Sequence, residues 1–308
     1  MTANERRIKE ANECIQKAEE HLKTSIWKMK TKPNYDSAAY EYERAAVCWR
    51  NAERLDFCKD AYLDAAKCHA SNNNLFHEAK SRESAGMAAK DAKDYHKAAE
   101  LFELSASGYF NTGSVDTAAQ TLDKAAKIML ENQENECAAK LYEKGLEIVQ
   151  HSSDKSKMAT NFAHRLINTY LKMADYVKAM DTSKNLIDRY NEIGEYGKIG
   201  QLVMGMTLIE LIKGDSIAAL KMLYYLPEAQ ISSFGQEMNA VKCLIKAYES
   251  YDNEALQNCL KSGMWRSMDN EYLRLMKQVK APEGECEEVS RHTVDIQQQE
   301  NEDEEDLR

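Results

Sequence analysis

The chain has 308 residues, of which 43% are hydrophobic and 30% are charged, with 12 glycines and only 3 prolines. This composition is typical of a globular protein with a large core, and it excludes collagen-like, mucin-like and low-complexity chains. Of the formal net charge of -10, residues 281–308 carry -9 (11 acidic and 2 basic residues), so the broad basic surface that nucleic acid requires is not expected on the remainder.

The first residues of the chain, Met1 to Lys9, are polar and charged and lack the apolar core of a secretory signal. No run of residues approaches the ~20 consecutive apolar residues that a membrane span needs. The 8 cysteines include no C-x-x-C pair. We therefore expect a cytoplasmic protein with reduced thiols.

Residues 24–33 link the first two expected helices and mix apolar with basic side chains. This mixture favours weak, reversible contact with an anionic lipid surface, since each lysine near such a surface contributes up to ~1 kcal/mol. An equally weighted alternative is that Trp27 simply packs onto the first helical hairpin. The candidate membrane-contact residues are Ile26, Trp27, Lys28, Met29 and Lys30.

From residue 34 onward, small residues recur at intervals of 20. Adjacent small residues occur at Ala45-Ala46, Ala65-Ala66, Ala85-Gly86, Ser105-Ala106 and Ala125-Ala126. A second set is separated by multiples of 20 and consists of Ala39, Ala79, Ala99, Ala119, Ala139, Ala159, Ala179 and Ala219. A fixed period of this length indicates a repeat architecture.

Within each repeat the spacing is helical. Ala38, Tyr42 and Ala45 place small, large and small side chains at i, i+4 and i+7, and the pattern returns from residues 98, 118 and 138. Because packed helices approach to ~8–10 Å, we expect this stripe to be buried. Two units of about 20 residues make one helical hairpin. We predict an all-α fold, a tetratricopeptide-repeat-like (TPR-like) right-handed superhelical solenoid of about 14 helices.

The repeat fades after about residue 190, and Pro227 closes the regular part. Three domains are expected. Residues 1–230 form the solenoid of helical hairpins, which includes the loop 24–33, and residues 231–280 form a C-terminal helical bundle. Residues 281–308 form an acidic tail, which cannot bury enough apolar area to fold and is expected to be disordered.

The sequence lacks the glycine-rich phosphate-binding, dinucleotide-binding, zinc-protease and serine-hydrolase motifs. We therefore expect no enzymatic activity, no catalytic residue and no cofactor. Cys48, Cys58 and Cys68 are ten residues apart, which is half a repeat, so they fall on different helix faces and indicate buried thiols rather than a metal site.

Four stretches resemble the soluble N-ethylmaleimide-sensitive-factor (NSF) attachment proteins, or SNAPs, and most closely the gamma form. The stretches are KPNYDSAAYEYERAAV (Lys32 to Val47), YLDAAKCHASNNNLFHEAK (Tyr62 to Lys80), GSVDTAAQTLDKAAK (Gly113 to Lys127) and MDNEYLRL (Met268 to Leu275). The resemblance spans about residues 5–280. The terminal EEDLR instead resembles the alpha and beta forms.

The resemblance implies an adaptor that binds syntaxin-type SNARE complexes and recruits the hexameric AAA ATPase NSF to disassemble them. It also implies vesicle-mediated and endoplasmic-reticulum-to-Golgi transport, membrane fusion and peripheral attachment to membranes. By the same resemblance Asp215, Glu249 and Leu307 contact the ATPase, whereas Lys157 and Arg165 contact the SNARE complex. Ile26, Trp27 and Met29 match the membrane loop, and Gln120 replaces a central basic residue of the alpha form.

A second hypothesis is a generic TPR-like scaffold whose groove holds an extended peptide or a chaperone tail. In that case Trp27 is structural, and the isolated protein recovers chaperones but no ATPase from a mixture of partners.

Overall fold

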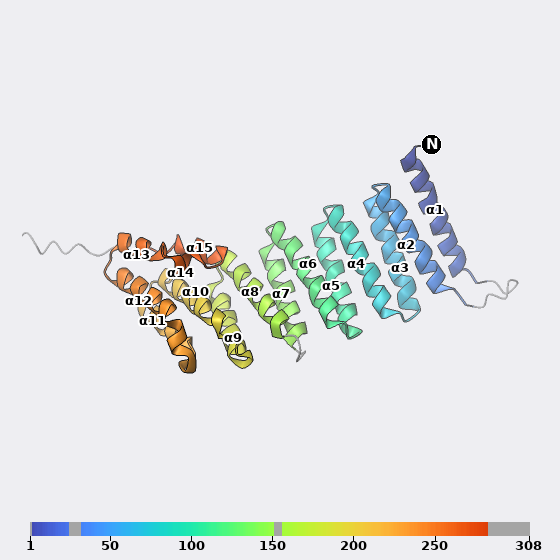
Figure 1. Cartoon of the computed structure of the whole chain (residues 1–308). Helices are drawn as coiled ribbons and strands as arrows, with labels where there is room; N and C mark the ends of the chain where they lie inside the picture. The colour runs from blue at the N-terminus through green and yellow to red at the C-terminus, as the bar shows by residue number, and fades with distance from the viewer. Residues whose placement is uncertain (1, 25–31, 151–155, 283–308) are drawn as a thin grey trace, which may run out of the picture. The chain divides into compact units, whose positions relative to one another are not determined.

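The computed structural model of the protein describes residues 2–24, 32–150 and 156–282. These residues form fifteen α-helices and three short 3₁₀ helices, and they contain no strand (Figure 1). The all-α repeat fold predicted from the sequence is confirmed. The chain divides into two compact units, Met1–Glu195 and Tyr196–Arg308. The expected division into domains at residues 230 and 280 stays a prediction.

Unit 1 is a stack of nine helices within the described residues, and each helix packs against the next. They are α1 (Ala3–Leu22), α2 (Tyr35–Asn51), α3 (Leu55–Ser71), α4 (Leu75–Asp91), α5 (Tyr95–Asn111), α6 (Val115–Glu131), α7 (Asn135–Gln150), α8 (Ser156–Lys172) and α9 (Tyr176–Ile193). From α2 to α7 each helix starts 20 residues after the previous one, as the spacing of the small residues predicts.

The predicted stripe of small and large residues is the contact between successive helices. Ala98, Phe102 and Ser105 are fully buried on α5, and the corresponding residues of α6 and α7 are buried as well. Alanines let the helix axes approach closely, whereas the single large side chain fills the remaining space. The stripe therefore produces an array in which each helix from α2 to α8 packs against a helix on both sides.

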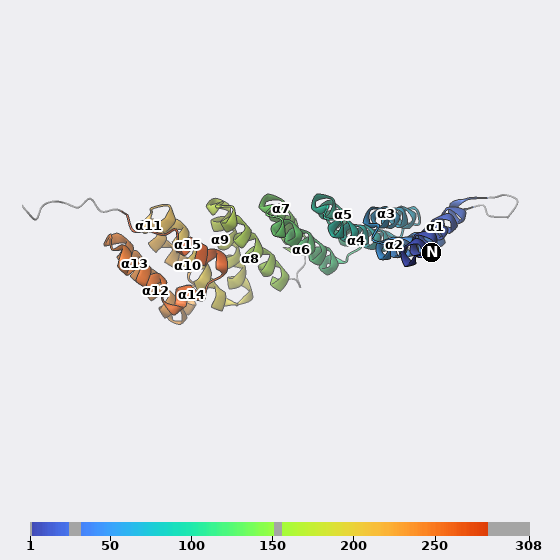
Figure 2. The ribbon, with the colours of Figure 1, turned by 90° about the horizontal axis from the view of Figure 1, so that it is seen from above.

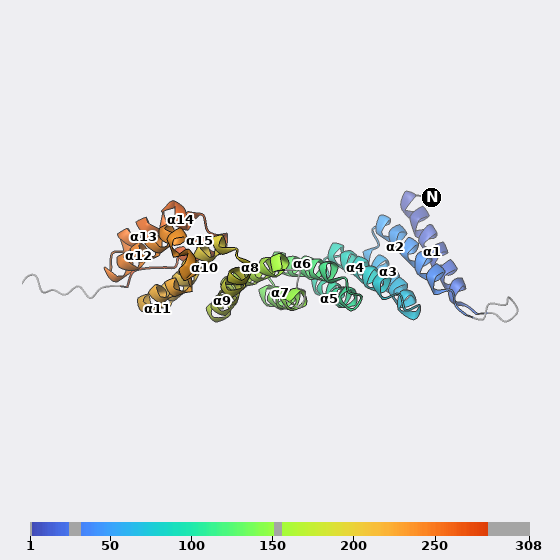
Figure 3. The same ribbon diagram turned by 60° about the horizontal axis from the view of Figure 1, so that its bottom comes forward.

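Unit 1 has two layers of helices. Figures 2 and 3 show α3, α5 and α7 along one side and α2, α4 and α6 along the other. Hydrogen-bonding side chains connect alternate helices within each layer, for example Ser81 of α4, which donates to Glu43 of α2 at 3.0 Å. Side chains 40 residues apart therefore occupy equivalent places on neighbouring helices of one layer.

The links between α2 and α7 are three residues long and share one geometry. In the α4–α5 link, the N–H of Lys93 donates to the carbonyl of Lys90 and the N–H of Asp94 donates to that of Ala89, which is the hydrogen-bond pattern of a Schellman motif. The middle residue has positive φ in each link, and these residues are Glu53, Asn73, Lys93, Gly113 and Gln133. Glycine at Gly113 suits this conformation, which costs other residues ~1–2 kcal/mol.

The residue that completes each link is also the N-cap of the next helix. Asn34, Asn74 and Asp94 each accept a hydrogen bond from a backbone N–H in the first turn. Ser114 occupies the same place before α6, but its hydroxyl makes no cap hydrogen bond. Its Oγ instead lies 3.4 Å from the Thr112 hydroxyl.

Substitutions at the middle residues of two links are expected to change the free energy of unfolding in opposite directions. Lys93 has φ of 64° and Gly113 has φ of 78°. Lys93→Gly should raise the free energy of unfolding by about 0.5–1 kcal/mol, because glycine adopts this conformation without strain. Gly113→Ala should lower it by about 1 kcal/mol. Urea denaturation measures both changes, and equal shifts of one sign would contradict the explanation.

Unit 2 has shorter and less regular helices. They are η1 (Tyr196–Lys198), α10 (Ile199–Ile212), α11 (Ser216–Lys221), η2 (Met222–Tyr225), η3 (Glu228–Phe234), α12 (Gly235–Glu249), α13 (Asn253–Leu260), α14 (Gly263–Arg266) and α15 (Asn270–Met276). Figure 3 shows α13 alongside α12, and these two helices pack together. α10 is the centre of the unit, since eleven of its fourteen residues are buried.

Candidate functional site

The two residues expected to contact a SNARE complex, Lys157 and Arg165, both lie on α8. Lys157 is in the first turn and is exposed. Arg165 lies two turns later and forms a charged hydrogen bond with Asp123 of α6, and Asp123 also pairs with Lys127 at 2.9 Å. The Arg165 side chain is 40% exposed, so it both connects two helices and presents part of its charge at the surface.

The Arg165–Asp123 pair belongs to a series of ion pairs between alternate helices. Lys124 of α6 lies 2.7 Å from Glu83 of α4, and Lys144 of α7 lies 2.8 Å from Glu103 of α5. The paired residues are 41 or 42 positions apart, which is the spacing of one hairpin. These pairs connect neighbouring helices of the same layer.

Glu83 has a second partner in the other layer. Its second carboxylate oxygen accepts a hydrogen bond from the Tyr109 hydroxyl of α5 at 2.9 Å. Burial, followed by this hydrogen bond and the charge of Glu83, raises the pKa of Tyr109 well above its ordinary value. Tyr109 therefore remains a neutral hydrogen-bond donor, and Glu83 connects three consecutive helices.

Two grooves lie between the even-numbered helices. The larger, between α4 and α6, has a volume of about 470 Å³, and the smaller, between α6 and α8, has about 140 Å³. The larger is lined by Lys80, Glu83, Ser84, Met87 and Lys90 of α4 and by Lys124, Lys127, Ile128 and Glu131 of α6. The smaller is lined by Ala119, Gln120 and Asp123 of α6 and by Met158, Asn161, Phe162 and Arg165 of α8. We call the surface formed by these two sets of residues the even-helix face.

The larger groove has four lysines and two glutamates around an apolar floor. Lys124 and Lys127 are paired with carboxylates, whereas Lys80 and Lys90 form no ion pair within the described residues. A groove with surplus positive charge and apolar side chains can hold an acidic helix by charge and by burial of apolar atoms. Sequence reasoning missed this groove, although the spacing of 40 between Lys80 and Gln120 indicates one shared face.

In unit 2, Asp215 and Glu249 are both exposed, and within the described residues no hydrogen bond or ion pair joins them. Asp215 caps α11 by accepting a hydrogen bond from the N–H of Ala218 at 2.7 Å. Glu249 is the last residue of α12, close in sequence to the exposed acids Asp252 and Glu254. Asp252 and Glu254 were not named as candidates from the sequence. The ExxDxE spacing of residues 249–254 could have indicated that these acids lie near Glu249.

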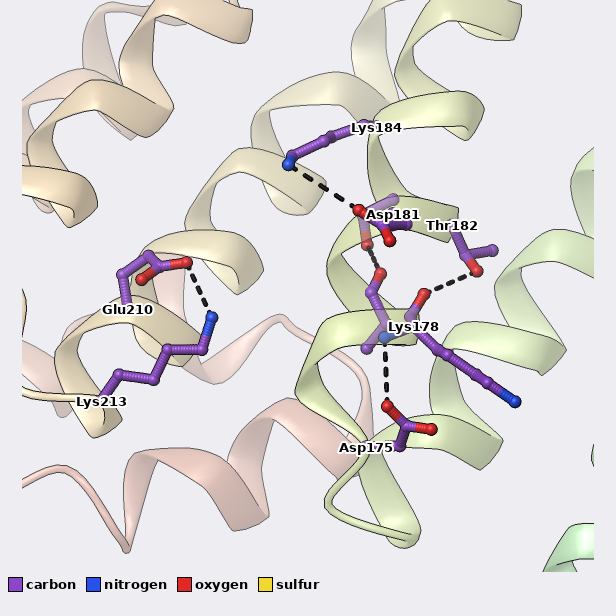
Figure 4. Close-up of polar contacts among 9 residues, drawn as sticks. Asp175, Lys178, Asp181, Thr182, Lys184, Glu210 and Lys213 are labelled. Atoms are coloured by element: carbon purple, nitrogen blue, oxygen red, sulfur yellow. Dashed lines mark hydrogen bonds and ion pairs between the residues drawn. The ribbon is translucent and has the colours of Figure 1, made fainter.

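Other charged residues near helix starts and ends form cap hydrogen bonds or ion pairs with residues close in sequence. In unit 1, Asp175 Oδ1 accepts from the Lys178 N–H at 3.1 Å at the start of α9 (Figure 4). In unit 2, Lys213 lies 3.0 Å from Glu210 just before the turn that leads to Asp215 (Figure 4). Charged residues of this kind stabilise helix ends and do not by themselves indicate a binding site.

The remaining candidates lie outside the described residues. They are Ile26, Trp27, Lys28, Met29 and Lys30 of the expected membrane loop, and Leu307 of the acidic tail, so the expected disorder of that tail is likewise untested. No helix in the described part of the chain is long and apolar enough to cross a bilayer. In the same residues, no group of three or more potential metal ligands lies together.

A family model and two curated relatives indicate one family. The family model "Soluble NSF attachment protein, SNAP" matches residues 9–281. A gamma-soluble NSF attachment protein of Dictyostelium discoideum is 26% identical over 257 residues, which cover 83% of this chain and 78% of the relative. A protein of the same name from Arabidopsis thaliana is 22% identical over 256 residues, covering 82% and 86%. The crystal structure of BtubC from P. vanneervenii covers 81% of this chain and 92% of its own at 15% identity, but its TM-score of 0.37 is too low to compare the folds.

Proposed function

Because this chain belongs to the soluble NSF attachment protein family, we propose that it is an adaptor that binds SNARE complexes and recruits the ATPase NSF for their disassembly. The observation that supports this function best is the groove between α4 and α6, with its two unpaired lysines beside an apolar floor. A bundle of acidic helices, such as a syntaxin-type SNARE complex, offers the matching charge and shape.

The even-helix face suits binding that must be reversed after each cycle. Its lysines are exposed or half-exposed, so each contact is weak and is screened over ~8 Å at physiological ionic strength. Several adaptor copies around one bundle would raise the overall affinity without any single strong contact. Arg165 of α8 lines the smaller groove, and Lys157 lies two turns before it on the same helix.

For the second partner, we assign Asp215 and Glu249 to contacts with basic surfaces of the NSF hexamer, and Leu307 to stimulation of its ATP hydrolysis. The exposed positions of Asp215 and Glu249 allow these contacts, since neither carboxylate is buried against unit 2. The adaptor itself hydrolyses nothing in this scheme. Its role is to connect the ATPase to the substrate complex.

We further propose that the protein acts in the cytoplasm at membrane surfaces, in vesicle-mediated transport between compartments such as the endoplasmic reticulum and the Golgi. The apolar and basic residues of the loop 24–33 would add weak contact with anionic lipid. Such contact assists an adaptor already held by a membrane-anchored SNARE complex, because two weak attachments act together.

Reversing the two unpaired lysines of the groove tests the proposed function. Lys80→Glu with Lys90→Glu should weaken binding to a soluble syntaxin-type SNARE complex by about tenfold to a hundredfold in 0.1 M salt, because attraction becomes repulsion. The measurement is titration calorimetry with the purified complex. Disassembly rates with NSF should fall in parallel.

The matched control is Lys140→Glu, which reverses an exposed lysine of α7 in the other layer. It should leave binding unchanged within about twofold. Equal losses in both variants would show a non-specific effect of net charge and would contradict a binding role for the groove. A wild-type protein that binds chaperone tails but neither the SNARE complex nor NSF would favour the scaffold hypothesis.

A further inference from the structure

Two positions on the surface of the even-numbered helices change from apolar to polar or basic along the array. Residues 40 positions apart occupy equivalent places on α2, α4 and α6, so they can be compared directly. One series is Tyr40, Lys80 and Gln120, and another is Val47, Met87 and Lys127. At both places the apolar member lies on α2 and the polar or basic member lies on α6.

The part of this surface that α2 forms, which we call the α2 end, has exposed apolar side chains. Tyr40 is 61% exposed and Val47 is 48% exposed, and Met87 on the neighbouring helix α4 is 37% exposed. Tyr40 and Val47 are seven residues apart and therefore lie on one side of α2. Single exposed apolar residues are common on protein surfaces, but these are next to a groove that already has an apolar floor.

The positive charge of Arg44 on this part of α2 is compensated by a neighbouring carboxylate. The Arg44 guanidinium donates to both carboxylate oxygens of Glu41 at 3.0 Å, and it lies 5.8 Å from the centre of the Tyr40 ring. Glu43 accepts the hydrogen bond from Ser81 of α4. The α2 end thus has no surplus positive charge, in contrast to the α4–α6 groove with its unpaired Lys80 and Lys90.

The two parts of this surface are continuous. Glu43 and Ser81 connect α2 to α4, and Glu83 and Lys124 connect α4 to α6, so a rigid partner lying across the α4–α6 groove reaches α2 in the direction of the array. An anionic bilayer is the weaker match for the α2 end, because bilayers attract lysine-rich surfaces and this part offers no surplus positive charge.

We propose that Tyr40 and Val47 form an apolar contact with the SNARE complex at the α2 end of this surface, and that this contact selects among SNARE complexes. The inference rests on the proposed function above. In this arrangement the α4–α6 groove attracts any acidic helical bundle, whereas the α2 end adds affinity only for bundles that expose apolar side chains at the corresponding place.

The experiment uses the full-length protein and the variant Tyr40→Ser with Val47→Ser. Binding to a soluble syntaxin-type SNARE complex should weaken about tenfold, and by the same factor at 0.05 M and 0.3 M salt, because burial of apolar atoms is not screened. A second variant, Tyr40→Lys with Val47→Lys, introduces the type of residue found at Lys80 and Lys127. It should make binding more dependent on salt than in the wild type.

Leu104→Ser is the matched control, since Leu104 is 45% exposed on α5 in the other layer. It should bind like the wild type. Poly-glutamate serves as a probe with charge but no apolar surface, and the serine variant should bind it as tightly as the wild type does. Far-ultraviolet circular dichroism should show unchanged helicity in all three variants, because the substituted side chains are exposed.

Three results would overturn the inference. The serine variant would bind the SNARE complex as tightly as the wild type does, or it would lose binding only at low salt. Alternatively, it would lose binding only to vesicles of phosphatidylserine and phosphatidylcholine, which would assign the α2 end to lipid. A wild-type protein that fails to bind the SNARE complex at all would instead reject the proposed function, and the inference with it.

Discussion

Replacing Gly145 with alanine is expected to lower the free energy of unfolding by about 2–3 kcal/mol. Gly145 lies on α7 where the other repeats have alanine or serine, and the Phe162 ring of α8 occupies the space of the missing side chain. An added Cβ would lie 2.3 Å from Phe162 Cε1, so the ring would have to move. Phe162 is only 5% exposed and packs edge-on against Tyr142, with 6.0 Å between the ring centres, which leaves it little room.

Urea denaturation measures the loss of stability, and hydrogen exchange shows where it arises. Amides of α7 and α8 should lose protection first, because each helix of an array depends mainly on its neighbours. Phe162→Leu in the Gly145→Ala background should recover part of the loss, giving a favourable coupling energy in a double-mutant cycle. Gly235→Ala is the control, since an added Cβ there meets nothing within 4 Å. A similar loss in both alanine variants would contradict the clash with the Phe162 ring as the cause of the loss.

Replacing Glu83 with alanine is expected to destabilise unit 1 by about 2 kcal/mol, because the Tyr109 hydroxyl would lose its carboxylate partner while Tyr109 is 2% exposed. Glu83→Gln keeps an oxygen that can accept from Tyr109 but removes the ion pair with Lys124, which is half-exposed. It should cost about 0.5 kcal/mol. Thermal unfolding of the two variants separates the hydrogen bond from the ion pair.

Tyr109→Phe in the Glu83→Ala background provides the corresponding control. Because the unpaired hydroxyl is then absent, this double variant should be more stable than Glu83→Ala alone. If Glu83→Gln proved as destabilising as Glu83→Ala, the ion pair with Lys124 would be the main contribution, contrary to our expectation.

The regular part of unit 1 was predictable because one physical requirement repeats in every helix. Ala38, Ala98 and Ala118 must be small for neighbouring helices to approach, so their spacing gives both the period and the buried side. The 20-residue spacing of the helix starts from α2 to α7 followed from the same period. Unit 2 follows no such rule. α10 is buried almost all round, so its sequence shows no single apolar stripe from which a packing partner could be inferred.

The candidate site was less predictable than the fold. The sequence places Lys157 and Arg165 on one helix, but the partner of Arg165 is Asp123, 42 residues earlier, and only the layered arrangement brings them together. Lys80 and Lys90 read as ordinary solvent-exposed lysines until the hollow between α4 and α6 is known. The sequence shows which place in the repeat a lysine occupies. Whether that lysine is paired with a carboxylate depends on the residues that the fold brings next to it.

The three-residue links have a consequence for how such a chain can change in length. Each link ends one helix and caps the next, so it contains no spare residue. One residue inserted within a helix would rotate everything after it by about 100° and turn the alanine stripe away from its neighbour. Whole hairpins of 40 residues can be duplicated or deleted while every later contact is kept, so this architecture should lengthen or shorten by that step and tolerate few intermediate sizes.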